Sequence, residues 1–133
     1  MNEDIIFLKL GGSLITEKGQ QETALPEVIF NLLSDLKRYL QSNPEQKILL
    51  GHGSGSFGHY AAAKYNTRNG VRTFTEWQGF HEVWESARKL NQIVIEISKQ
   101  VDLELISFPP SAGLFSKNGQ VVNWSTQSIE RAL

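Results

Sequence analysis

The sequence predicts an α/β fold with an open, mainly parallel sheet flanked by helices, and three observations support this. Two short apolar runs, at residues 5–10 and 47–53, each run into glycine, as buried strands that end in a tight turn do. Between them, residues 26–41 carry apolar side chains at helical spacing, and Pro26 suits the first turn of a helix. The order strand, helix, strand is that of a parallel unit with a helical crossover.

Two helices are expected after the second strand. The glycine-rich loop at residues 51–58 opens a short segment, residues 59–65, that is predicted to form one or two helical turns. Residues 75–101 carry the longest periodic pattern in the chain, with apolar side chains on one broad face. This pattern predicts a long helix.

The C-terminal part of the sequence is predicted to contain a strand, a hairpin and the start of a helix. Residues 103–108 are apolar and precede two prolines, which is typical of a third buried strand. Asn118 and Gly119 lie between two strand-like arms and predict a hairpin. Residues 126–133 predict the first turns of another helix, with Thr126 or the serine before it as the N-cap.

Composition excludes several classes of function. The chain has 133 residues, which suit one domain, and 13 basic and 14 acidic residues give a net charge of -1, too weak a field to attract nucleic acid or an anionic membrane. Without cysteine it has no disulfide or thiolate metal site, and its three histidines lack metal-ligand spacing, so we predict no metal site. The first apolar run is too short for a signal peptide or membrane span, and we expect a cytoplasmic protein.

Both predicted strands of the parallel unit end in glycine turns at the same edge of the sheet. Gly11 and Gly12 follow the first strand, and Gly53, Gly55 and Gly58 follow the second. Ligands of open parallel sheets bind beyond the carboxyl ends of the strands, and successive N–H groups in glycine turns form concavities that bind anions. We therefore predict a phosphate in this crevice.

Three basic side chains are candidates to face that phosphate. Lys9 ends a strand that we expect to be buried, where its ammonium requires an anion, and Lys18 follows the first glycine turn. His59 would turn its ring toward the phosphate from the start of a helix. Structural explanations remain open: Gly11 and Gly12 would also suit a plain tight turn with Lys9 reaching solvent, and His59 a capping or packing position.

A dinucleotide site is a competing interpretation of the second turn. Its three glycines are spaced G-x-G-x-x-G, and Glu76 lies about twenty residues further on. This interpretation leaves the first glycine turn unexplained, and the helix that follows is short for a crossover. A Walker A loop is absent from the sequence. We expect His52 to hydrogen-bond within its loop and His81 to be a surface or packing residue.

Three stretches together resemble the amino acid kinase superfamily. They are "FLKLGGSLITEK" at residues 7–18, "GHGSGSFGHYAAAKY" at 51–65 and "SARKLNQIV" at 86–94. Within the superfamily the sequence is most similar to isopentenyl phosphate kinases, from about Ile5 to its end. The first stretch is shared by the whole superfamily, whereas "SFGH" is more selective and is shared chiefly with the related fosfomycin kinases.

The resemblance implies an ATP-dependent kinase that transfers the γ-phosphate of ATP, bound with Mg²⁺, to a phosphate monoester such as isopentenyl phosphate. The catalytic residues that it implies are Lys9, Lys18 and His59. The acceptor-binding residues that it implies are Gly53, Ser54, Gly55, Gly58 and His59. The residues that it implies for the ATP phosphates are Lys9, Gly11, Gly12 and Ser13.

Two further expectations concern the acceptor. Trp77, Phe80 and Trp84, near the start of the long predicted helix, either line a pocket for an isoprenoid tail or belong to the core, and the core is favoured for Trp84. The family pattern has glycine where this sequence has Ser54, so a side chain is added beside the acceptor phosphate.

Family members are about twice as long, and their second half supplies the adenine pocket. The resemblance thus implies that residues 1–133 form the N-terminal, phosphate-acceptor part, without the C-terminal nucleotide-binding part. The implied partners are a small phosphorylated substrate and either a complementing C-terminal half or a second copy, with neither nucleic acid nor membrane. Two alternatives are a fosfomycin-type phosphonate kinase and a non-catalytic module for anion binding or assembly.

Overall fold

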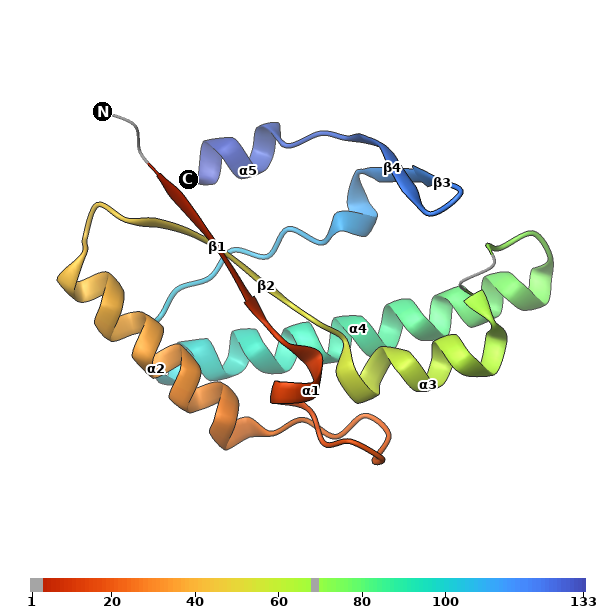
Figure 1. Cartoon of the computed structure of the whole chain (residues 1–133), viewed down its shortest axis with the longest axis horizontal. Coiled ribbons are helices and arrows are strands. Elements are labelled where there is room, and N and C mark those ends of the chain that lie inside the picture. Colours follow the sequence, from red (N-terminus) through yellow and green to blue (C-terminus); the bar gives the residue numbers. More distant parts are fainter. Residues whose placement is uncertain (1–3, 68–69) are drawn as a thin grey trace.

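A computed structural model describes residues 4–67 and 70–133 and contains the predicted parallel unit (Figure 1). The elements in chain order are β1 (Ile5–Leu10), α1 (Gly12–Ile15), α2 (Pro26–Ser42), β2 (Lys47–His52), α3 (Gly55–Tyr65), α4 (Phe74–Gln100), a 3-10 turn η2 (Pro110–Ala112), β3 (Leu114–Lys117), β4 (Gln120–Trp124) and α5 (Gln127–Ala132).

The strands β1 and β2 pair in parallel, and α2 is the crossover between them. Leu10 lies opposite His52, so both strands end at the same edge. Pro26 begins α2 as predicted, because its fixed φ suits the first helical turn, and Asn43 caps the other end. The two strands, the crossover helix and their boundaries are thereby confirmed.

A hydrophobic core lies where α2 and α4 meet the strands. Its buried members are Leu10, Ile15, Ile29, Leu33, Leu36, Phe57, Leu90, Val94, Ile97 and Leu103. The members on α2 and α4 recur at three- and four-residue spacing, which places them on one face of each helix. This core fixes the long helix behind the end of β2, where the second glycine turn begins.

The long helix α4 begins with a capping box that the sequence analysis missed. The Thr73 hydroxyl accepts from the Glu76 N–H, and the Glu76 carboxylate accepts from the Thr73 N–H at 2.7 Å. The T-x-x-E pattern is the known signature of such a start. It accounts for Glu76 as a helix cap and removes the acidic residue that a dinucleotide site would need.

The helix α3 runs beside α4 and is longer than predicted (Figure 1). It begins at Gly55, inside the glycine-rich loop, and Gly58 is already in its first turns. The helix crosses α4 closely at Gly79, because a Cβ added there would lie 2.3 Å from the Tyr65 Cβ. A glycine at this crossing lets the two backbones approach.

The predicted third strand is wrong. Residues 103–108 form no strand, although Leu103 is buried and Leu105 packs against the core. Ile106 between them and the prolines is 75% exposed. The apolar side chains are therefore used for packing, while the following prolines cannot donate to a sheet ladder.

The rest of the C-terminal part matches the expectations in outline. The strands β3 and β4 form the predicted antiparallel hairpin, with Asn118 (φ 52) and Gly119 (φ 74) in the left-handed conformation of a tight turn. Thr126 is the N-cap position of α5, but its hydroxyl donates to Glu130 rather than capping a backbone N–H. Figure 1 shows the hairpin and α5 lying away from α2, α3 and α4.

One face of the parallel sheet is open to solvent among the described residues. Phe7 is 75% exposed, and Lys9, two residues along the same strand, is exposed as well. Parallel sheets are ordinarily covered on both faces, so this face has the character of a surface that another layer covers. None of the described helices has the length and apolarity needed to cross a membrane.

We predict that Gly79→Ala destabilises the fold by about 1–3 kcal/mol, because the new methyl group overlaps the Tyr65 side chain and pushes α3 from α4. Urea unfolding monitored by circular dichroism measures the change. Gly113→Ala is the matched control, since a Cβ there meets nothing within 4 Å. Equal stability of the two variants would contradict the close crossing.

Candidate functional site

The two glycine turns lie against each other, main chain to main chain. A Cβ added to Gly12 would lie 2.4 Å from the Gly55 nitrogen, and one added to Gly53 would lie 2.6 Å from the Gly12 nitrogen. Gly55 also has a φ of +48°, which side chains rarely adopt. We refer to residues 11–13 and 53–55 as the paired turns. Their contact explains why glycine stands at three positions.

Hydrogen bonds fasten the paired turns together. The Gly53 N–H donates to the Leu10 carbonyl at 2.9 Å. The Thr16 hydroxyl donates to the Gly12 carbonyl at 2.7 Å and accepts from the Ser56 N–H at 3.0 Å. Thr16 is 2% exposed, so this buried hydroxyl joins the first turn to the start of α3. Sequence reasoning missed it, because a threonine three residues after a tight turn carries no pattern of its own.

Several N–H groups of the paired turns have no protein partner within residues 4–67 and 70–133. They belong to Gly11, Gly12, Ser13, Ser54 and Gly55. Unpaired donors beside one another at the ends of two parallel strands are suited to bind the oxygens of anions. The structure thus brings together residues that the sequence analysis assigned to two different phosphates.

Two of the predicted glycines, Gly53 and Gly58, allow close packing but offer no unpaired N–H group to an anion. The Gly53 N–H is taken by Leu10, and the Gly58 N–H donates to the Ser54 carbonyl inside α3. A Cβ added to Gly58 would lie 2.6 Å from the Ser54 hydroxyl oxygen and 2.7 Å from the Ser54 Cβ. Gly58 therefore makes room for the Ser54 side chain.

The expectation that Lys9 is buried is wrong. Lys9 is exposed and lies opposite Gly51 on β2, on the open face of the sheet. Phe7 on the same face is 75% exposed, so this face is uncovered among the described residues. The argument from a buried ammonium therefore fails, although the residue lies one position before the end of β1.

Lys18 is exposed in the segment that joins α1 to α2. This segment is attached to the first turn of α3. The Glu22 N–H donates to the Ser56 carbonyl at 3.4 Å, and the Thr23 N–H lies 3.4 Å from the Ser56 hydroxyl. The segment carrying Lys18 is thus anchored next to the second of the paired turns.

Glu22 attaches the same segment to α4. Its carboxylate accepts from the Lys89 ammonium at 2.9 Å and from the Ser86 hydroxyl. The hydrogen bond from Lys89, followed by that from Ser86, holds the pKa of the Glu22 carboxyl below its ordinary value of 4.5. Glu22 and Ser86 lie 64 residues apart, so no local sequence pattern indicates this attachment of Glu22 to α4.

His59 lies on α3, four residues after the first residue of the helix rather than at its start. Its ring is exposed and makes no hydrogen bond, ion pair or ring contact within residues 4–67 and 70–133. A capping position is therefore excluded, and an exposed ring is not a core position. The other histidines match the expectations: His52 contacts the Gly53 carbonyl at 3.1 Å, and His81 stacks on Trp84 at the surface.

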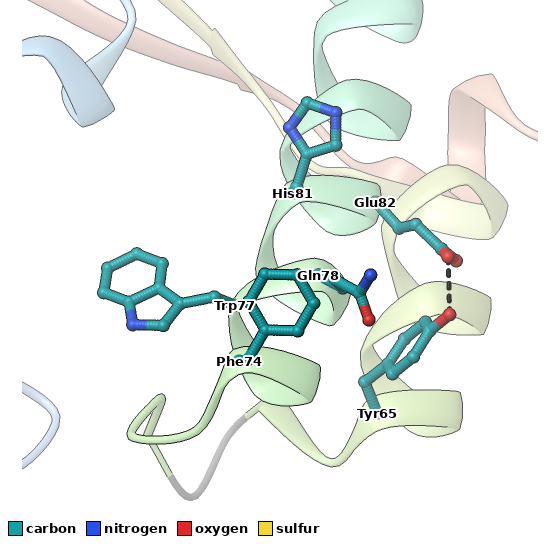
Figure 2. A pocket seen from close by; sticks show the side chains of 6 residues that line it. All are labelled: Tyr65, Phe74, Trp77, Gln78, His81 and Glu82. Atoms are coloured by element: carbon teal, nitrogen blue, oxygen red, sulfur yellow. Dashed lines mark hydrogen bonds between the residues drawn. The ribbon is translucent and has the colours of Figure 1, made fainter.

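An aromatic pocket of about 450 Å³ lies between α3 and α4 (Figure 2). It is lined by Tyr65, Phe74, Trp77, Gln78, His81 and Glu82. The Tyr65 hydroxyl donates to Glu82, and this bond, with the nearby Lys64 ammonium, lowers the pKa of the Glu82 carboxyl. Tyr65 is the last residue of α3, whereas Gly55 is the first, so the pocket lies about 15 Å along the helix from the paired turns.

The aromatic side chains of α4 are not core residues. Trp77, Phe80 and Trp84 are 57%, 43% and 39% exposed, and the Trp84 indole N–H donates to the Ser111 hydroxyl at 3.1 Å. Trp77 lines the pocket with Tyr65, whereas Phe80 and Trp84 do not. The core interpretation favoured for Trp84 is therefore wrong.

Comparison with known proteins finds relatives that are isopentenyl phosphate kinases. No protein-family model matches the chain. The isopentenyl phosphate kinase of Methanocaldococcus jannaschii is 30% identical over 135 residues, which cover 97% of this chain and 51% of that protein. That of Thermoplasma acidophilum is 31% identical over 108 residues, 81% of this chain and 42% of that protein. The resemblance to isopentenyl phosphate kinases is confirmed. The chain spans about half the length of these curated relatives.

Solved structures agree with the sequence relatives. An X-ray structure of isopentenyl phosphate kinase superposes with a TM-score of 0.81 at 25% identity, over 98% of this chain and 54% of that one. A substrate complex of isopentenyl phosphate kinase gives 0.78 at 28% identity, over 96% of this chain and 49% of that one. The fold is therefore that of one part of these kinases, which disfavours a dinucleotide site at the second turn.

We predict that Gly58→Ala weakens the fold by about 1–3 kcal/mol, because its methyl group overlaps Ser54. Adding Ser54→Gly removes the overlapping atoms, so the double variant is expected to recover most of the loss. Thermal unfolding of the two single variants and the double variant measures the coupling. Simple additivity of the two changes would contradict the contact.

We predict that Lys89→Met lowers stability by about 0.5–1 kcal/mol at pH 7, because it breaks the half-exposed ion pair with Glu22. The folded pKa of Glu22 is depressed, so its contribution is complete above about 4.5 and is lost as the pH falls through the lower, folded value. Urea unfolding at pH 7 and at pH values below 4.5 measures this. Lys117→Met, on the hairpin, is the control, and a loss that persists in acid would contradict the attachment of Glu22 to α4.

Proposed function

We propose that this chain provides the phosphate-acceptor part of an ATP-dependent kinase that converts isopentenyl phosphate to isopentenyl diphosphate. The observation that supports this proposal most directly is the contact of the paired turns, which brings the unpaired N–H groups of residues 11–13 close to those of residues 54 and 55. Phosphoryl transfer between two phosphates needs two anions side by side, and two adjacent sets of donors meet this need. The similarity to isopentenyl phosphate kinases supports the choice of acceptor.

In this reaction an oxygen of the acceptor phosphate attacks the γ-phosphorus, and the bond from that phosphorus to the β-phosphate oxygen breaks, releasing ADP. We assign the N–H groups of Gly11, Gly12 and Ser13 to the ATP phosphates. Those of Ser54 and Gly55 are assigned to the acceptor phosphate. Such donors act by stabilising charge and need not move during the reaction.

Three basic side chains complete the proposed site. Lys9 and Lys18 would neutralise the transferring phosphoryl group, and His59 would hold the acceptor phosphate. Their exposure supports this, because none of the three is bound to another side chain in the described part of the chain. Long cationic side chains at the mouth of a site bring together reactants that otherwise repel each other.

Magnesium fits this chain poorly as a protein-bound ion. Among the described residues no group of three His, Asp or Glu side chains could hold a metal. If Mg²⁺ takes part, ATP phosphates supply its ligands here, and we assign no step to the metal.

The proposal includes a partner. The chain matches about half of each kinase relative, and we propose that it corresponds to their N-terminal half. A complementing nucleotide-binding polypeptide, or a second copy, would then cover the open face of β1 at Phe7. A cytoplasmic location agrees with the absence of cysteine from the sequence.

We expect the purified chain to bind isopentenyl phosphate in calorimetric titration and His59→Ala to weaken this binding about tenfold to hundredfold, the usual effect of one charge-assisted hydrogen bond. Lys117→Ala is the control, because Lys117 is exposed on the hairpin, outside both the paired turns and the aromatic pocket. ATP with Mg²⁺ is expected to bind weakly.

Other outcomes of these binding and activity measurements would support a different function. Tight binding of fosfomycin in competition with isopentenyl phosphate would favour a phosphonate kinase. Binding of neither acceptor would favour a non-catalytic module. Full kinase activity of the isolated chain would contradict the need for a complementing polypeptide.

A further inference from the structure

His52 is the last residue of β2 and connects the second of the paired turns to α4. One ring nitrogen, Nδ1, lies 3.1 Å from the Gly53 carbonyl oxygen, and the other, Nε2, lies 3.1 Å from the Asn91 side-chain oxygen. The Asn91 amide nitrogen donates to the Ser107 hydroxyl at 3.0 Å. The ring and the amide are both half-buried. A polar chain thus runs from the turn through α4 to residue 107.

Donor and acceptor chemistry fixes the proton on Nδ1. A carbonyl oxygen only accepts, so Nδ1 must carry the hydrogen that meets Gly53. If the ring is charged, Nε2 donates to the Asn91 oxygen. If it is neutral, the Asn91 amide turns over, its NH₂ donates to Nε2, and the Ser107 hydroxyl donates to the amide oxygen. Both arrangements leave Nδ1–H on the Gly53 carbonyl.

Fixing that carbonyl also fixes the next N–H group. The Gly53 carbonyl and the Ser54 N–H belong to one planar trans peptide, so they point in opposite directions. The Gly53 N–H is held by Leu10 on the preceding peptide. Glycine has no side chain to restrain the turn, so these two hydrogen bonds determine where the unpaired Ser54 N–H points.

We infer that His52 and Asn91 are positioning residues, which aim the Ser54 N–H at the acceptor phosphate. The inference rests on the proposed function for the identity of the anion, but the orientation itself is a property of the free chain. Asn91 acts on the site only through His52. Neither side chain needs to touch the acceptor.

The test combines nitrogen-resolved NMR of the full chain with calorimetry. In the unaltered chain the His52 ring is expected to carry its proton on Nδ1. In Asn91→Ala the ring is expected to exchange between tautomers, the Ser54 amide resonance to move, and the dissociation constant for isopentenyl phosphate to rise about tenfold. In Asn91→Asp the carboxylate accepts from Nε2, so with hydrogens on both ring nitrogens Nδ1–H stays on the Gly53 carbonyl, and most of the affinity is expected to be retained.

Gln92→Ala is the matched control, because Gln92 is exposed on the same helix and bonds only to Glu96. Ser107→Ala removes the outer bond at an exposed residue and is expected to shift the same resonances by less, so the test survives if Asn91→Ala fails to fold. The inference is overturned if, in Asn91→Ala, the His52 ring keeps its tautomer and the Ser54 amide resonance does not shift. It is also overturned if His52 loses its Nδ1–H tautomer while the affinity for isopentenyl phosphate is unchanged.

The two proposals fail differently. An unaltered chain that binds neither isopentenyl phosphate nor inorganic phosphate overturns the proposed function, whatever the NMR signals show. Normal binding in the unaltered chain and in Asn91→Ala, with the ring released, overturns only the positioning of Ser54.

Discussion

The main chains of the two glycine turns touch, and the positions of the surrounding elements follow from that contact. Gly12 and residues 53–55 approach so closely that no Cβ fits between them. The approach is possible because β1 and β2 end at the same edge, and it is secured by the buried Thr16 hydroxyl between the first turn and α3. A methyl group at the contact would have to separate the two strand ends, so the main-chain contact sets how closely the two turns approach.

Such a site depends on N–H groups more than on charged side chains. Backbone donors keep a fixed direction and lose little freedom when an anion arrives, whereas exposed side chains such as those proposed for this site, Lys9, Lys18 and His59, would lose rotamer freedom on binding one. The structure anchors the peptides of the paired turns and the segment that carries Lys18, through Glu22, Thr23 and Ser56. In the proposed site, orientation would come from the backbone and charge from exposed side chains.

The sequence predicted those features that depend on local pattern. The crossover unit, the long helix, the hairpin at Asn118 and the meeting of both glycine turns follow from periodicity and turn chemistry. The exposure of Lys9 did not, because it depends on which elements cover each face of the sheet. The missing strand at residues 103–108 is a similar case, since an apolar run cannot tell packing from pairing.

The meeting of the two glycine turns was predictable, but not which of their glycines carry unpaired N–H groups. Pattern alone treats all five glycines as equal, whereas the structure separates those with unpaired N–H groups from Gly53, whose N–H is engaged, and Gly58, which makes room for Ser54. The hydrogen bonds of Glu22 and Asn91 join residues 64 and 39 positions apart in the chain. Contacts at that range leave no local signal, so only the fold could reveal them.

The contact of the paired turns also joins ligand binding to folding. Gly12 and Gly55 meet only after α2 has carried the chain back beside β1, so the unfolded chain has no such array of donors. An anion bound there interacts with the folded state alone and stabilises it in proportion to the logarithm of its concentration. If the proposed site binds inorganic phosphate, the free energy of unfolding of this chain would depend on the phosphate concentration of the surrounding solution.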